Sequence, residues 1–162
     1  MKLLILVGAA LTLSINVQAG VKEKKAIKKM QEGVTEMLKS TKKSCGNTSI
    51  EVKFDLKSYK DFYSKNEKKM KIKRDEERFL YGYAKRNTIA VLEALNTICK
   101  DPDYKAEVAK VKVINITPNS AYDNNTSSFK LGNKGTALTA SLITNQFSRR
   151  SSDFEDDIKK IW

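Results

Sequence analysis

The chain has 162 residues, of which 31 are Lys or Arg, 19 are Asp or Glu and none is His, so its formal net charge is +12. The absence of His excludes Ser-His-Asp and Cys-His catalysis and the usual His-containing zinc sites. The length is that of one modest domain.

The N-terminus has the features of an export signal. Lys2 supplies the positive charge, residues 3–17 form an apolar run, and Val17-Gln18-Ala19 places small or aliphatic residues before a cleavage site. The apolar run is shorter than the roughly 20 residues that a membrane-spanning helix needs. We therefore predict that residues 1–19 are a cleaved signal peptide and that the protein is periplasmic or secreted.

The chain has two cysteines, Cys45 and Cys99. An even pair in an exported protein favours a disulfide, and closing a loop of this length stabilises a fold by about 4 kcal/mol. The alternatives are two buried free thiols or one catalytic thiolate. Cys99, however, sits at the end of a predicted helix, and a helix C-terminus does not lower the pKa of a thiol.

Residues 21–43 are predicted to form an amphipathic helix, because apolar residues recur at helical spacing while the lysines fall outside the apolar arc. The turn residues Ser44-Cys45-Gly46-Asn47 end it. Residues 49–56 then alternate apolar and charged side chains, which is typical of a strand with one buried face.

Two further helices are predicted over residues 58–74 and 75–100. In the first, Ser58 and Asp61 resemble a capping box. The second carries apolar residues around more than half of its circumference. We therefore expect it to pack on two sides and to be the central core helix.

The second half of the chain is predicted to be rich in strands. Asp101-Pro102 starts a short turn or helix, and residues 118–128 form a polar loop. Asn133-Lys134-Gly135 is the turn of a hairpin. The predicted strands cover residues 107–117, 128–133 and 136–145.

Residues 152–162 are predicted to form a C-terminal helix. Ser152 and Glu155 would make its capping box. Its apolar stripe consists of Phe154, Ile158, Ile161 and Trp162. We expect this stripe to dock on the domain, because an exposed stripe that ends in Trp is costly.

The predicted order is α-β-α-α-β-β-β-α in a single domain over residues 20–162, without a transmembrane segment. Consecutive strands with short links favour an antiparallel β-meander of about four strands, packed against two or three amphipathic helices. The fold class is α+β. We expect the first strand, which is far from the others in sequence, to join one edge of the sheet.

Catalytic and metal-binding patterns are weak. Gly132-Asn133-Lys134-Gly135 is better explained as a hairpin turn than as a phosphate loop, and Glu76 and Glu77 are adjacent on a helix and point about 100° apart. Asp123-Asn124-Asn125-Thr126 lacks the closing Glu of a calcium loop. We therefore expect no catalysis, no cofactor and no metal. A small His-free enzyme, which needs a cleft with a buried carboxylate or lysine, is the less favoured alternative.

Positive charge is concentrated in the N-terminal half. Residues 20–74 hold 17 basic and 7 acidic side chains, whereas residues 75–162 hold 13 basic and 12 acidic ones. A regional excess of this kind indicates a surface for an anionic partner or a solvated face. The candidate binding residues, where the density is highest, are Lys65, Lys68, Lys69, Lys71, Lys73 and Arg74.

These features predict an exported, non-catalytic binding protein that meets an anionic envelope polymer, a lipid headgroup or an acidic protein. Nucleic acid is disfavoured, because the cluster is nearly all Lys and no aromatic residues interleave with it as in nucleic-acid motifs. The alternative is a structural or protein-interaction module whose interface is the apolar C-terminal helix or a face of the sheet. The oligomeric state is not indicated.

Overall fold

The computed structural model describes residues 20–72, 77–145 and 149–162, so the predicted signal peptide lies outside the described residues. This part of the chain forms five α-helices and a four-stranded sheet, which confirms the α+β class. The elements in chain order are α1 (Val21–Cys45), β1 (Glu51–Phe54), α2 (Leu56–Ile72), α3 (Glu77–Ile98), α4 (Pro102–Val108), β2 (Val113–Pro118), β3 (Ser128–Gly132), β4 (Ala137–Leu142) and α5 (Ser152–Lys159).

The sheet is mixed, with the strand order β1-β2-β4-β3. β1 pairs parallel with β2, β2 pairs parallel with β4, and β3 pairs antiparallel with β4. The predicted antiparallel meander is therefore wrong, although β1 does form one edge. The connection over residues 119–127 is long enough for β3 to lie one strand position away from β2. β4 occupies the position between β2 and β3, so β3 forms the other edge of the sheet.

The two faces of the sheet differ in polarity. On the face toward the helices, the central strands bury apolar side chains completely, and these are Ile114, Ile116, Leu138, Ala140 and Leu142. On the opposite face, the strand register aligns Lys53, Asn115, Thr139 and Lys130 in one row across the sheet. This alternation is what a sheet with one wet face requires.

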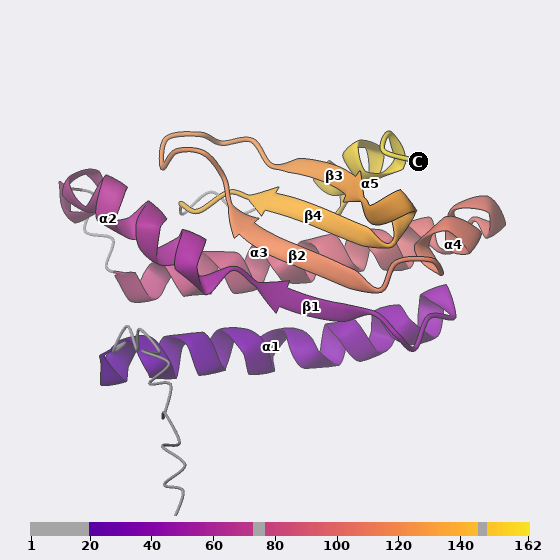
Figure 1. The fold of residues 1–162 in the computed structure, drawn as a ribbon, viewed down its shortest axis with the longest axis horizontal. Helices are drawn as coiled ribbons and strands as arrows, with labels where there is room; N and C mark the ends of the chain where they lie inside the picture. Colours follow the sequence, from indigo (N-terminus) through magenta and orange to yellow (C-terminus); the bar gives the residue numbers. More distant parts are fainter. Residues whose placement is uncertain (1–19, 73–76, 146–148) are drawn as a thin grey trace, which may run out of the picture.

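Helices α1, α3 and α5 form a layer against the sheet, with α3 in the middle (Figure 1). α3 packs along α1 on one side and α5 on the other, which confirms the expected central core helix. In α5, the ring of Phe154 meets Phe129 of β3 edge to face at 5.4 Å between centroids, and Ile158 is fully buried. The C-terminal helix therefore docks on the domain.

Both predicted capping boxes are wrong. Asp55 directly precedes α2 and caps it. Its Oδ1 accepts from the Ser58 backbone N–H at 3.0 Å, and its Oδ2 accepts from Ser58 Oγ at 2.6 Å. The cap therefore lies about one helical turn before the predicted Ser58–Asp61 box. At α5 the N-cap position is Ser151, which makes no side-chain capping bond. Ser152 is already helical there, so the predicted box with Glu155 does not form.

The predicted strand over residues 107–117 starts too early, because α4 continues to Val108 and β2 begins at Val113. Asp101 caps α4 by accepting from the Asp103 backbone N–H at 3.0 Å, and Pro102 occupies the first helical turn. The cap and the proline are helix-start signals, and they favour a helix at this position. The apolar residues near the end of that helix suggest a strand instead.

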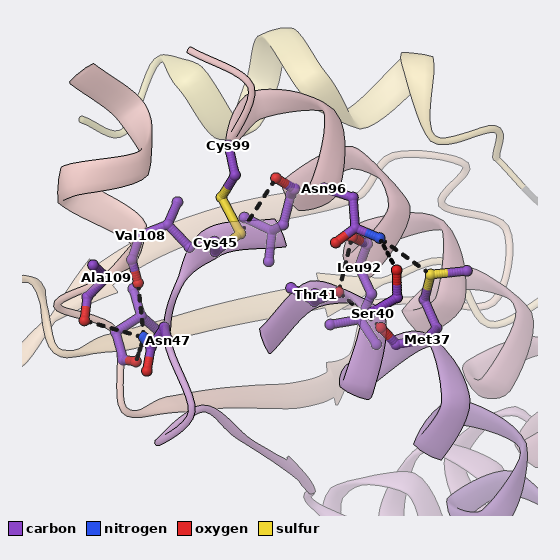
Figure 2. Close-up of a disulfide and its surroundings, with 12 residues drawn as sticks. Met37, Ser40, Thr41, Cys45, Asn47, Leu92, Asn96, Cys99, Val108 and Ala109 are labelled. Atoms are coloured by element: carbon purple, nitrogen blue, oxygen red, sulfur yellow. Dashed lines mark hydrogen bonds between the residues drawn. A yellow bond between two sulfur atoms is a disulfide. The ribbon is translucent and has the colours of Figure 1, made fainter. Parts of the chain in front are cut away.

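The Cys45–Cys99 disulfide is present, as predicted, and joins the end of α1 to the residue after α3, with 5.1 Å between the Cα atoms (Figure 2). Gly46 then turns the chain with φ of 64°. The buried amide of Asn47 donates to the carbonyl oxygens of Val108 at 3.0 Å, Ala109 at 3.1 Å and Val111 at 2.7 Å. This amide fixes the turn before β1 against the connection before β2.

Candidate functional site: a basic pole

Four of the six predicted binding residues lie on the second half of α2: Lys65, Lys68, Lys69 and Lys71. All four are exposed. Lys73 and Arg74 lie outside the described residues. The predicted cluster therefore lies on the solvent-exposed end of α2. Its lysines differ in whether a carboxylate already pairs with them.

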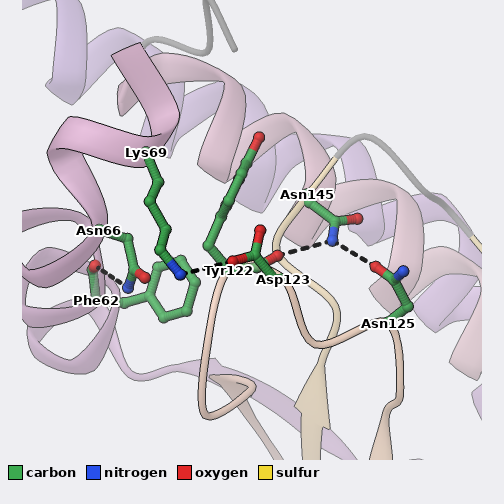
Figure 3. Close-up of polar contacts among 7 residues, drawn as sticks. All are labelled: Phe62, Asn66, Lys69, Tyr122, Asp123, Asn125 and Asn145. Atoms are coloured by element: carbon green, nitrogen blue, oxygen red, sulfur yellow. Dashed lines mark hydrogen bonds and ion pairs between the residues drawn. The ribbon is translucent and has the colours of Figure 1, made fainter. Parts of the chain in front are cut away.

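Two of these lysines are already engaged. Lys69 Nζ lies 2.6 Å from Asp123 Oδ2, on the loop that follows β2 (Figure 3). Lys71 Nζ lies 2.7 Å from Glu67 Oε1, and the hydrogen bond that Lys71 donates to this carboxylate raises the pKa of Lys71. Lys65 and Lys68 have no carboxylate partner among the described residues. The first pair joins α2 to the loop, but both of its side chains are more than half exposed, so it contributes little to stability.

A second group of lysines was not included in the predicted site. Lys22, Lys25 and Lys29 follow one face of α1, at spacings of three and four residues, and line one hollow with Phe79 of α3. Together with Ala26 they line an open hollow of about 530 Å³. The described residues place no carboxylate within ion-pair distance of these three lysines, so their charge is available to a partner.

Exposed apolar side chains lie at the same end of the molecule. Among the described residues, the large hydrophobic side chains that are exposed are Val21 (72%), Ile72 (82%) and Phe79 (38%). α1 begins, α2 ends and α3 begins at this end (Figure 1). We call it the basic pole: Lys22, Lys25, Lys29, Lys65 and Lys68 with Val21, Ile72 and Phe79.

A buried network fixes the pole. The carboxylate of Glu23, which is 9% exposed, accepts a 2.8 Å hydrogen bond from the Tyr81 hydroxyl and lies 3.3 Å from Lys60 Nζ. These contacts join the first turn of α1 to α2 and α3. Because Glu23 points inward, Lys22 and Lys25 are held on the outside of the same helix turn.

The sequence contained only part of this site. The spacing of Lys22, Lys25 and Lys29 is readable, but the whole segment 21–43 is rich in lysine and nothing distinguishes these three from the rest. Their distinguishing feature is Phe79, which lies 50 residues from Lys29 in the chain. Only the packing of α1 against α3 brings them together.

The described residues contain no group of three or more Cys, Asp or Glu side chains that could hold a metal ion. Across the same ranges, no helix is long and apolar enough to cross a membrane. No protein-family model matches the chain, and no curated protein and no solved structure is detectably similar to it. The chemistry that the pole offers is the binding of anions next to apolar surface.

Proposed function

We propose that the protein is an exported, non-catalytic binding protein whose basic pole binds an anionic surface of the cell envelope. The anionic surface that it fits best is a lipid bilayer. The observation that carries the proposal is the coincidence, at one end of the molecule, of exposed apolar side chains and lysines that have no carboxylate partner among the described residues. Scattered surface hydrophobics need no explanation, but a group rimmed by one sign of charge indicates an interaction site.

The two kinds of side chain act on different parts of a bilayer. A lysine near an anionic membrane surface contributes about 1 kcal/mol, so Lys22, Lys25 and Lys29 together contribute about 3 kcal/mol. Val21, Ile72 and Phe79 would insert at the boundary between headgroups and acyl chains. Because stable attachment usually needs two such signals, the combination favours a membrane over a purely charged partner.

The beginning of α1 adds to the same field. This helix starts at the pole, and the N-terminus of a helix carries roughly half a positive charge. Predicted cleavage after Ala19 would also leave the α-amino group of Gly20 at this end. An acidic polymer or an acidic protein would bind these charges, but it would make fewer contacts with the apolar side chains.

Vesicle sedimentation tests the proposal. The wild-type protein should bind phosphatidylglycerol vesicles but not phosphatidylcholine vesicles, and rising salt should weaken the binding because it screens exposed charge. The triple variant K22Q/K25Q/K29Q should bind on the order of 100-fold more weakly, from the 3 kcal/mol above. The control K39Q/K42Q/K43Q removes the same charge from the other end of α1 and should bind nearly as well as the wild type.

A second variant distinguishes a bilayer from a soluble polyanion. Ile72 is largely exposed, so Ile72→Ser should leave the fold intact, weaken vesicle binding severalfold and leave its salt dependence unchanged. Equal losses in the two lysine variants would mean that net charge alone is responsible. Undiminished vesicle binding by Ile72→Ser, together with equally strong retention on an acidic polysaccharide, would favour a polymer and contradict the bilayer.

A further inference from the structure

The sequence contains four matches to Asn-X-Ser/Thr, the acceptor pattern for N-linked glycans. They begin at Asn47, Asn115, Asn124 and Asn125. The pattern is short and arises by chance, so a match alone does not make a site. The fold separates the four, because the atom that is modified is the side-chain nitrogen Nδ2, and this atom must be accessible to an enzyme.

Three of the four matches are closed by the fold. Asn47 is buried, and its Nδ2 donates to three backbone carbonyls. Asn115 is half-buried in β2, a strand whose backbone pairs with a neighbour on both sides. Asn124 is half-buried, and its Nδ2 donates to Ser120 Oγ at 3.1 Å.

Asn125 differs from these three, because it is exposed on the loop between β2 and β3. Its Oδ1 accepts from the buried Asn145 Nδ2 at 2.7 Å, and the same nitrogen donates to Tyr122 O at 2.8 Å (Figure 3). A backbone carbonyl only accepts, so Asn145 must face it with nitrogen and Asn125 must meet that nitrogen with oxygen. Asn125 Nδ2 is therefore turned away from Asn145, and it donates no hydrogen bond among the described residues.

The backbone around Asn125 is held in place. Arg149 Nη2 donates to Asn125 O at 2.8 Å. The buried Asn119 side chain donates through Nδ2 to the carbonyl oxygens on either side, those of Asn124 and Thr126. These bonds fix the carbonyl groups of three successive residues, so the loop presents the Asn125 side chain to solvent on a defined backbone.

The residues that flank Asn125 complete the pattern. Ser127, two positions later, supplies the required hydroxyl, and it lines a small surface hollow with Thr126 and Arg149. Asp123, two positions earlier, is exposed, whereas the corresponding residues of the other three matches are not acidic. The pair between Asp123 and Lys69 is exposed and weak, so a basic side chain of an enzyme can replace Lys69.

We infer that Asn125 is the acceptor of an N-linked glycan, which is added to the folded protein after export. Asn125 Nδ2 bonds to the anomeric carbon of a polyprenyl-pyrophosphate-linked oligosaccharide. The bond from this carbon to the pyrophosphate oxygen breaks, the lipid pyrophosphate leaves with the electron pair, and the amide proton passes to a base of the transferase. Nothing is oxidised or reduced. The inference requires the predicted export but not the proposed membrane binding.

Glycosylation of the purified folded protein tests whether the fold selects Asn125. The lipid-linked oligosaccharide is supplied with one of two transferases: one that requires an acidic residue two positions before the Asn, and one that accepts the plain pattern. Mass spectrometry should show a single glycan with either enzyme. A synthetic peptide of residues 113–130 should also be modified at Asn115 by the second enzyme, because no fold protects it.

Two alanine variants distinguish Asn125 from its neighbour Asn124. Ser127→Ala removes the hydroxyl that the Asn125 match needs and should slow the modification at least tenfold. Thr126→Ala removes the hydroxyl that the Asn124 match needs and should leave the rate unchanged. Asn125→Gln should abolish the modification, and it covers the case in which Ser127→Ala disturbs the bond that Ser127 Oγ accepts from the Ile143 backbone N–H.

Fragment-ion mass spectrometry of the protein isolated from its own cells should place the glycan on Asn125. The inference fails if that residue is unmodified there, if the folded protein is refused while the peptide is accepted, or if Thr126→Ala is the variant that loses the glycan. K22Q/K25Q/K29Q should be glycosylated as the wild type is, and Asn125→Gln should bind vesicles as the wild type does. The two proposals can therefore fail independently.

Discussion

Asp55 joins the end of β1 to the start of α2 and makes the first turn of that helix depend on one carboxylate. Its two hydrogen bonds from Ser58, first from the side chain and then from the backbone, hold the pKa of Asp55 below its ordinary value of 3.8. A lowered pKa in the folded state means that the stabilisation is complete above the unfolded pKa. It is then lost as the pH falls through the lower, folded value.

We expect Asp55→Ala to lower the free energy of unfolding by about 1 kcal/mol at pH 7, the usual cost of removing a helix cap. Below about pH 4 the difference from the wild type should shrink, because the wild-type carboxylate becomes protonated there. Urea unfolding at a series of pH values measures both effects. Asp61→Ala, the acidic residue of the capping box that the sequence suggested, serves as the control. A loss for Asp61→Ala equal to that for Asp55→Ala would contradict this assignment.

Among single residues, the sequence located roles that depend on near neighbours and missed those that depend on distant ones. Cys45 and Cys99 were paired correctly because the predicted export and the even number of cysteines left few options. Asn47 gave no signal of its role, since its three acceptors lie more than 60 residues away. The ion pair between Lys69 and Asp123 was likewise not predicted, because Asp123 comes from a loop that the sequence could not place.

At the scale of elements, α5 depends on tertiary contact for its stability. It has eight residues, fewer than an isolated helix needs, and its N-cap residue makes no side-chain bond. Phe154 and Ile158 are buried against the sheet and α3, and Ile161 and Trp162 pack on the same core. The C-terminal helix is therefore part of the core rather than a free interface.

Phe154→Ala should lower the free energy of unfolding by about 3 to 5 kcal/mol, because it removes a fully packed aromatic ring and leaves a cavity. Thermal and urea unfolding measure the loss. Asp156→Ala, an exposed position of the same helix, should change stability by no more than about 0.5 kcal/mol. If Phe154→Ala were equally mild, the docked position of α5 would be wrong.

Hydrophobic periodicity in the sequence predicts which segments are strands, but not how those strands pair. Alternation identified β1 and the β3–β4 hairpin, because each alternation is a local pattern. It could not indicate whether β2 pairs with β3 or β4, since both have apolar residues on one face. In the sheet β4 takes the central position, where Leu138, Ala140 and Leu142 are fully buried, whereas Phe129 and Leu131 of the edge strand β3 are half-buried.

At the scale of the whole molecule, the basic pole and the disulfide lie at opposite ends of α1. A helix of 25 residues is about 37 Å long. A protein seated on a membrane by its pole, with α1 upright, would therefore hold the disulfide far from the bilayer surface. The basic pole and the proposed glycosylation site at Asn125 share no side chain.

Removing the disulfide should destabilise the whole domain rather than one end. The bond closes a loop with a sequence separation of 54, so we expect its loss to cost about 4 kcal/mol. Urea unfolding of the wild type with and without a reductant measures this cost, and Cys45→Ala/Cys99→Ala is the matched variant. A midpoint that does not move on reduction would show that the bond contributes nothing to stability.

The partners of the segment from α1 to β1 lie far along the chain, and this would set the order of assembly if the predicted signal peptide directs export. Thr41 bonds to Leu92, Asn47 bonds to Val108, and Glu51 of β1 aligns with Val113 of β2. A chain that crosses a membrane N-terminus first delivers α1 and β1 long before these partners arrive. Contacts between segments so distant in sequence form slowly. We expect the leading half to remain unfolded during translocation, and the domain to close only after β2 has emerged.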